Sequence, residues 1–306
     1  DPSNDTYESS VEEVHVYLGS GNDNFKVDST CNYGTSYIYG GAGDDTITVA
    51  ATTSGLYPNS LRQVDYVAGA LVVDGEADPD TIIVDDSGED DPNTGSFEGA
   101  TVSGLDMTGS VTFASADTIE IRLGAQDDTF YVPGTSAGLT YTVKMGGGFD
   151  KVYLGTRQGS EDSGSLANFQ GDIVIEGEGP EFGDTIYFND QDSTDGQTFI
   201  ISNAITGTTI LQNGAPWPID TTTVSRTGTA NIYYRRAETV VLNAGQGADI
   251  INLYSTHREQ DVLGGHSSTF TVNGGGGNDT INLGEPSGSG FSLDSFVIDL
   301  APPTFD

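Results

Sequence analysis

Short alternations of apolar and polar residues recur along the chain, each directly after an aspartate. After Asp45, for example, the residues two and four positions on are Ile47 and Val49, with Thr48 between them. The same two positions are apolar after eight aspartates. These sixteen residues are Phe25, Val27, Ile47, Val49, Ile82, Val84, Phe130, Val132, Val152, Leu154, Ile186, Phe188, Ile251, Leu253, Ile281 and Leu283. A period of two indicates a strand with one buried face, so the pattern predicts eight short strands.

Glycine-rich turns lead into these strands. The fullest copy lies in residues 38–49, where a short strand is followed by Gly40-Gly41-Ala42-Gly43, an aspartate pair and a second strand. Strands this short cannot bury a face alone, but stacked copies form one continuous core. The sequence therefore predicts an all-β fold, a parallel β-solenoid similar to a β-helix, with glycine and aspartate turns.

The short repeats are grouped into a longer sequence repeat. Similar blocks begin near residues 11, 116 and 237, and each opens a unit that contains several turns. Two irregular stretches, at about 85–112 and 189–236, carry alternating β-type residues and turn signals, which predicts hairpin-like excursions from the solenoid. We therefore expect residues 1–306 to form one elongated repeat body, a segment of a longer array.

The turns resemble the hemolysin-type, or RTX, calcium-binding repeat, written G-G-x-G-x-D-x-U-x with U large and apolar. Residues 40–48 and 274–282 fit every position, and the other copies lack one or more glycines. The long unit is similar to arrays in very large secreted calcium-binding and adhesin-like proteins. The resemblance implies that turn carbonyls and the sixth-position aspartate bind Ca²⁺. Carried over to this chain, it names Asp45 and Asp279 first, then Asp23, Asp128, Asp150 and Asp249.

The spacing departs from that family. The closest motifs here are 22 residues apart, from Asp23 to Asp45 and from Asp128 to Asp150, whereas family repeats follow one another directly. This favours a wider coil with one such corner per turn of the solenoid. Two interpretations of the aspartates stay open: a cation could lie between stacked carboxylates, or each aspartate could cap its own turn by accepting backbone N–H bonds.

The net charge of the chain limits the kinds of partner that it can bind. Its net charge is −36, from 46 acidic against 10 basic residues. Nucleic acid is excluded as a partner because binding requires a basic face, and the same reason disfavours an anionic membrane surface. Divalent cations would relieve the self-repulsion, and hard oxygen ligands favour Ca²⁺. The alternative is that the acids only keep a large surface soluble. No stretch is apolar enough to predict membrane insertion.

Two single residues carry weaker signals. Cys31 is the one cysteine of the chain, so an internal disulfide is impossible, and a small buried side chain or an intermolecular bridge are the alternatives. Asn4 begins an Asn-Asp-Thr sequon and is the candidate glycosylation site of a secreted glycoprotein. Glycans are therefore possible partners.

Taken together, these features predict a non-catalytic structural protein, not an enzyme. We expect an extracellular or cell-surface module of a fibre, appendage or adhesive protein, which associates with itself end to end or continues in a longer chain. One alternative is a polysaccharide lyase or epimerase on a parallel β-helix, which needs a basic residue beside clustered acids. Another is a carbohydrate- or ice-binding face built from outward threonines. These threonines are Thr46, Thr81, Thr129, Thr185 and Thr280.

Overall fold

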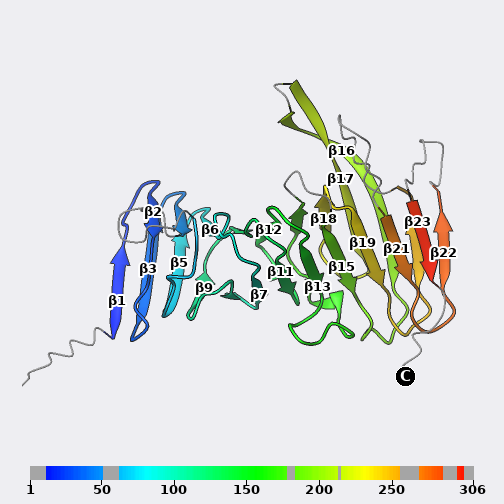
Figure 1. Cartoon of the computed structure of the whole chain (residues 1–306), viewed down its shortest axis with the longest axis horizontal. Helices are drawn as coiled ribbons and strands as arrows, with labels where there is room; N and C mark the ends of the chain where they lie inside the picture. Colours follow the sequence, from blue (N-terminus) through cyan, green and yellow to red (C-terminus); the bar gives the residue numbers. More distant parts are fainter. Residues whose placement is uncertain are drawn as a thin grey trace, which may run out of the picture.

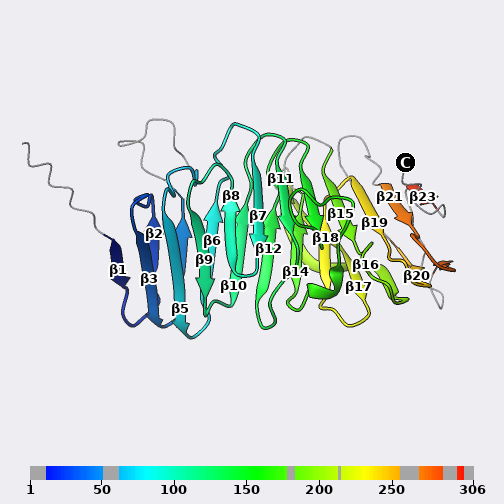
Figure 2. The ribbon, with the colours of Figure 1, turned by 90° about the horizontal axis from the view of Figure 1, so that it is seen from below.

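The computed structural model describes residues 12–50, 62–177, 183–212, 215–255, 269–284 and 295–299. For residues 204–212 and 215–220 and most of 295–299 it describes the backbone only. This part of the chain forms an elongated body of two facing sheets, with the strands of each sheet side by side along its length (Figure 1). Seen from below, the chain passes from one sheet to the other as it advances (Figure 2). The expected all-β solenoid is confirmed.

The first sheet, here called sheet A, has 12 strands in the described residues. In spatial order they are β1 (Glu13–Tyr17), β3 (Thr35–Ala42), β5 (Ala70–Ala77), β9 (Ser110–Ala114), β8 (Thr101–Gly104), β7 (Thr94–Glu98), β11 (Thr129–Val132), β13 (Lys151–Leu154), β15 (Thr185–Asn189), β19 (Thr239–Asn243), β21 (Thr269–Asn273) and β23 (Ser295–Asp299).

The second sheet, sheet B, has 11 strands in the same part of the chain. In spatial order they are β2 (Asn24–Val27), β4 (Thr46–Val49), β6 (Thr81–Asp85), β10 (Thr118–Arg122), β12 (Thr140–Lys144), β14 (Ile173–Glu176), β18 (Ile232–Arg235), β17 (Ala215–Arg226), β16 (Thr198–Gln212), β20 (Ile250–Leu253) and β22 (Thr280–Leu283). A short 3₁₀-helix, η1 (Leu166–Asn168), lies in the connection between β13 and β14.

Most neighbouring strands are parallel, and outside the antiparallel segments β7–β9 and β16–β18 each coil contributes one strand to each sheet. In sheet B, Asn24 lies opposite Thr46, and Ile47 lies opposite Ile82. The 22-residue distance between the first two turn motifs is therefore the length of one coil. This register places like residues above one another along the body, which is how short strands come to share a single core.

The two stretches expected as hairpin-like excursions are three-stranded antiparallel segments inside the sheets. The segment β9–β8–β7 continues sheet A, and β18–β17–β16 continues sheet B. The expectation that they leave the solenoid is wrong for the first segment, because Phe97, Val102 and Val111 line the core. In the second segment, the outer part of the β16–β17 hairpin projects beyond the body (Figure 1).

The order of strands repeats with the sheets exchanged. From β1 to β9 the chain visits sheets A, B, A, B, A, B and then places three strands in A; from β10 to β18 it visits B, A, B, A, B, A and then places three strands in B. Each set of nine strands makes an odd number of sheet visits, so the next set begins on the opposite sheet. Consequently β10 lies in sheet B, whereas β1 and β19 lie in sheet A.

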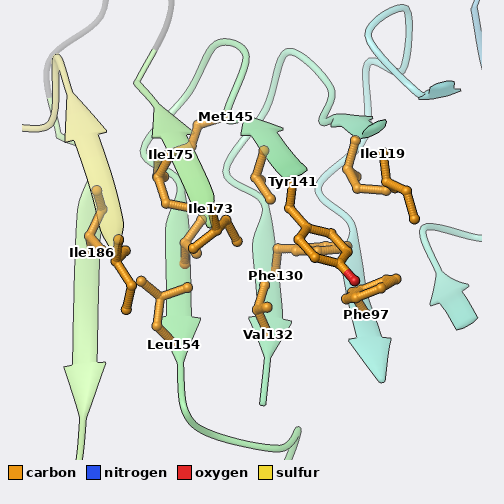
Figure 3. Close-up of a cluster of buried hydrophobic side chains, with 14 of the residues drawn as sticks. Phe97, Ile119, Phe130, Val132, Tyr141, Met145, Leu154, Ile173, Ile175 and Ile186 are labelled. Carbon is orange, nitrogen blue, oxygen red and sulfur yellow. The ribbon is translucent and has the colours of Figure 1, made fainter. Parts of the chain in front are cut away.

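The core lies between the sheets and is made by the alternating residues. Figure 3 shows side chains of β11 and β13 pointing toward those of β12 and β14, with Tyr141 beside Phe97. The rings of Phe97 and Tyr141 have centroids 5.1 Å apart. Thirteen of the sixteen predicted core residues are buried, and Phe25 and Ile281 pack partly buried against the cluster. Burial of each such side chain contributes about 1.5–3 kcal/mol, so the stacked ladders supply most of the stability.

Leu283 corrects the prediction that all sixteen residues lie inside. Its side chain is 50% exposed. It belongs to β22, and within the described residues no further strand of sheet B lies beyond β22 to cover it. Burial of an alternating residue therefore depends on the next coil as well as on its parity.

Ladders of like residues also follow the outer faces. On sheet A the rings of Tyr131, Tyr153 and Tyr187 stack, with neighbouring centroids 5.0 and 4.5 Å apart. On sheet B, Thr46 lies opposite Thr81. Such cross-strand pairs stabilise a sheet. The described part of the chain contains no helix with the length and apolar character needed to cross a membrane.

Candidate metal centre

The glycines of the turns are required by the stacking of the coils. Gly41 has a φ of 102°, which side chains rarely adopt, and a Cβ there would collide with the carbonyl oxygen of Gly19 on the neighbouring coil. At Gly40, a Cβ would lie 2.6 Å from Oδ2 of Asp45. One glycine thus admits the carboxylate and the other admits the backbone of the adjacent coil, which explains the glycine pattern of the best turn.

From Asp45 onward, each corner aspartate of this type accepts a hydrogen bond from the coil before it. The backbone N–H of Asp23 donates to Oδ1 of Asp45 at 2.8 Å, and the N–H of Asp45 donates to Oδ1 of Asp80 at 2.9 Å. The N–H of Asp80 then donates to Oδ2 of Asp117 at 3.2 Å. We call such a row a carboxylate ladder. This first ladder runs along the corner where the chain enters sheet B.

A second carboxylate ladder runs along the corner where the chain enters sheet A. It begins at Asn93, whose N–H donates to Oδ1 of Asp128 at 2.6 Å. It continues through Asp150 and Asp184 to Glu238, with N···O distances of 2.7, 3.1 and 2.9 Å. A third, shorter ladder lies along the corner where the chain enters sheet B. There the N–H of Gln197 donates to Asp249 at 2.7 Å, and that of Asp249 donates to Asp279 at 2.9 Å.

All six aspartates expected to bind calcium lie in these ladders, but the structure does not gather them at one place. They form three neighbouring pairs, Asp23 with Asp45, Asp128 with Asp150, and Asp249 with Asp279. In each pair one carboxylate oxygen of the second residue accepts the N–H of the first. Capping is therefore present, although it reaches to the preceding coil. Calcium binding by these six residues stays a prediction.

The second carboxylate oxygen has two different environments. Oδ2 of Asp128 accepts the N–H of Gly124 at 2.8 Å, so this residue caps its own turn as well. Oδ2 of Asp249 accepts the N–H of Gly245 at 3.1 Å in the same way. The buried second oxygen has no hydrogen-bond partner in four other ladder residues. These are Asp23, Asp45, Asp80 and Asp150.

Burial makes several ladder carboxyls weak acids. Together with the charges of Asp184 and Asp128, it raises the pKa of Asp150 to about 9. It also raises the pKa of Asp128 to about 6, although two backbone N–H groups oppose the shift. At neutral pH and without a cation, Asp150 therefore carries a proton, which removes the repulsion between stacked carboxylates.

A separate acidic cluster lies beside the start of the second ladder. Asp65 precedes β5, and Asp86 and Glu89 follow β6; one carboxylate oxygen from each lies within 4.8 Å of the other two. Asp86 is fully buried and Glu89 is 5% exposed, whereas Asp65 is partly exposed. Among the described residues, this is the one group of three acids that could hold a metal ion.

The cluster is held in place by backbone and amide donors. Oδ1 of Asp86 accepts the N–H of Val64 at 3.0 Å, and its Oδ2 accepts Nδ2 of Asn93 at 3.2 Å. Oε1 of Glu89 accepts the N–H groups of the two following residues at 2.8 and 3.0 Å. Burial, together with the charges of Asp65 and Glu89, raises the pKa of Asp86 to about 8. The site thus concentrates oxygen ligands and negative charge.

The sequence did not identify this cluster. Residues 85–92 read as an irregular acidic stretch, and nothing in the turn pattern joins them to Asp65. The signal that could have found them is the density of acids directly after the strand Ile82–Val84, where a corner must follow. Asp65 comes into contact only through the stacking of coils.

Comparisons with known proteins add no assignment to this geometry. No protein-family model matches the chain, no curated protein matches it, and no solved structure matches it. Function must therefore be inferred from the residues themselves.

Proposed function

We propose that this chain is a non-catalytic structural module of an extracellular or cell-surface protein, stabilised by calcium and built into a fibre or appendage. The observation that carries the proposal is the continuity of the carboxylate ladders, in which one coil after another repeats the same backbone-to-carboxylate bond. Corners that repeat from coil to coil stabilise the stack of coils. An enzyme active site, in contrast, would be a single place on the body whose residues differ from those of the other coils.

The charge distribution supports a scaffold over an enzyme. A polysaccharide lyase or epimerase would need a basic residue beside clustered acids. Arg235, one of the two adjacent arginines, forms an ion pair with Glu176 on the neighbouring strand. The charged groups that act on Asp86 are the carboxylates of Asp65 and Glu89. This arrangement fits cation binding better than proton abstraction from a sugar acid.

Association end to end is the form of assembly that the ends of the sheets favour. On β1, Val14 is 44% exposed and Tyr17 is 70% exposed. At the other end, Leu283 and Val297 are 50% and 49% exposed. Within the described residues, β1 and β23 are the edge strands of sheet A and β22 is an edge strand of sheet B, and edge strands with apolar side chains favour further strand pairing. A head-to-tail contact between two different ends does not close on itself, so it would build a filament.

The test is sedimentation velocity with negative-stain imaging of the chain in millimolar Ca²⁺ over a wide range of concentrations. We expect elongated particles whose length grows with concentration. Val14→Asp should suppress the growth, and Phe149→Asp, an exposed residue away from both ends, should leave it unchanged. A monodisperse monomer at every concentration would contradict self-association.

A further inference from the structure

The start of the second carboxylate ladder differs from its later coils. From the second coil onward, each ladder side chain accepts the N–H of the residue one coil earlier. Asn93 occupies the first position, and β7, which follows it, pairs on its other side with the antiparallel strand β8. The acidic cluster lies beside Asn93, where a preceding corner of this ladder would be expected. Nδ2 of Asn93 donates to Oδ2 of Asp86 and so joins the ladder to the cluster.

Two buried oxygens at this place have no hydrogen-bond partner. One is Oδ1 of Asn93, a residue only 3% exposed, and the other is Oδ1 of Asp65. The amide of Asn93 is directed into the cluster by its bond to Asp86, so its oxygen lies at the same end of the side chain. A buried polar atom without a partner costs about 1–3 kcal/mol, and a cation would satisfy both oxygens.

From these residues we propose that Asp65, Asp86, Glu89 and Asn93 bind one calcium ion that begins the ladder of sheet A. The proposal deepens the calcium-stabilised function above and rests on it. It places an ion at the irregular corner after β6, outside the glycine turns, where the N–H of a preceding coil is missing.

Electrostatics favours an ion here. Two unit charges about 4 Å apart repel by about 4 kcal/mol at an effective dielectric constant of 20. Three ionised carboxylates with oxygens within 4.8 Å of one another would accumulate this repulsion. The charged groups that act on Asp65 are Glu89 and Asp106, which are also acids. A divalent cation would convert the repulsion into attraction.

The ligand set selects calcium among common metals. It contains three carboxylates and one amide oxygen, and zinc prefers nitrogen and sulfur ligands. Magnesium retains several waters and takes one or two carboxylates, whereas calcium accepts six to eight oxygens with flexible geometry. The partial exposure of Asp65 leaves one side of the cluster accessible to water ligands.

The ion would tie together three successive segments of the body. Val64 and Asp65 belong to the connection before β5, and Val64 already donates to Asp86 after β6. The carbonyl of Glu89 accepts the N–H of Ala125, in the corner before β11, at 2.9 Å. Calcium at this place would therefore stabilise the junction between the antiparallel segment of sheet A and the coils on both sides of it.

The test compares Glu89→Gln with wild type in the full chain. The glutamine can keep an oxygen for the two N–H groups that Glu89 accepts, but it loses the charge. After removal of metal with EDTA, calorimetric titration with CaCl₂ should show the loss of one site, or binding at least tenfold weaker. In calcium the variant should melt below wild type; in EDTA it should melt at or above wild type, because one of the closely spaced acids is gone. A residue with only a hydrogen-bonding role would not reverse the order.

Two matched variants decide between this site and the glycine turns. Asp90→Asn removes the same charge from an exposed residue of the same loop and should change neither binding nor melting. If Asp45→Asn weakens calcium binding and Glu89→Gln does not, the ion lies at the turns; that result would overturn this site and leave a calcium-stabilised scaffold intact. If calcium gives no binding heat and no change in melting temperature, the proposed site and the proposed stabilisation by calcium are both wrong. Self-association would still be tested separately by sedimentation.

Discussion

The carboxylate of Asp45 accepts the backbone N–H of Asp23, which lies one coil earlier, at an N···O distance of 2.8 Å. The same relation between successive corners recurs from Asp128 to Asp150 and from Asp249 to Asp279. An aspartate in this fold therefore caps the backbone of its neighbour, and a row of them joins successive coils at the corner, beside backbone bonds such as that from the N–H of Thr46 to the carbonyl of Asp23.

Removal of one ladder carboxylate should destabilise the protein through the donor that it leaves behind. We expect Asp45→Ala to lower the free energy of unfolding by about 1–3 kcal/mol, since the N–H of Asp23 loses its acceptor. Asp45→Asn keeps an acceptor and should cost less. Asp90→Ala, on an exposed residue, should stay within about 0.5 kcal/mol. Urea unfolding in EDTA measures all three; equal costs for the alanine and asparagine variants of Asp45 would contradict the capping role.

The approach of neighbouring coils can be tested with two glycines that share a backbone conformation. Gly41 and Gly21 have φ angles of 102° and 113°. A Cβ at Gly41 would meet the carbonyl of Gly19, whereas a Cβ at Gly21 would meet nothing within 4 Å. Both alanine variants carry backbone strain of about 1–3 kcal/mol, but only Gly41→Ala must also separate two coils. We expect it to melt clearly lower than Gly21→Ala; equal melting temperatures would mean that the coils do not stack through this turn.

The buried acids predict an unusual dependence of stability on pH. Asp150 has a pKa of about 9 in the folded protein against an ordinary value of 3.8. Between these values the folded state holds a proton that the unfolded state has released, so stability falls as pH rises across this range. Without divalent cations, the protein should be more stable at pH 5 than at pH 8.

The variant Asp150→Asn isolates this contribution. It removes the titrating group but keeps an oxygen that can accept the N–H of Asp128. We expect it to reduce the slope of unfolding free energy against pH by up to about 1.4 kcal/mol per pH unit and to raise stability at pH 8 in EDTA. An unchanged slope, measured by urea unfolding at several pH values, would show that Asp150 is ionised in the folded protein.

The sequence predicted the strands well where the pattern is local. Ile47 and Val49 alternate with threonine after a glycine turn, and both lie in the core, because parity alone selects the buried face of a strand. Leu283 has the same local pattern but is half exposed, because burial also requires a neighbouring coil. The pattern within one strand predicts which of its faces is buried, but not whether a neighbouring coil is present to cover that face.

The remaining parts could not be predicted because they depend on contacts between distant segments. The antiparallel segment that contains Phe97 and Val102 has strand-like alternation, yet its place within sheet A is set by pairing with β5 and β11 through its outer strands. The six turn aspartates were selected by motif and lie in the ladders. Asp65 and Asp86 belong to no motif, and the stacking of coils alone brings them together.

The central claim, a repeat scaffold stabilised by calcium, is tested most directly by thermal melting of the full chain in millimolar Ca²⁺ and in EDTA. A ligand at about one hundred times its Kd stabilises the folded state by about 2.7 kcal/mol. For a chain of this size, that predicts a melting temperature higher in calcium by roughly 5 °C or more, with a smaller effect of Mg²⁺. Identical melting in calcium and in EDTA would contradict the claim.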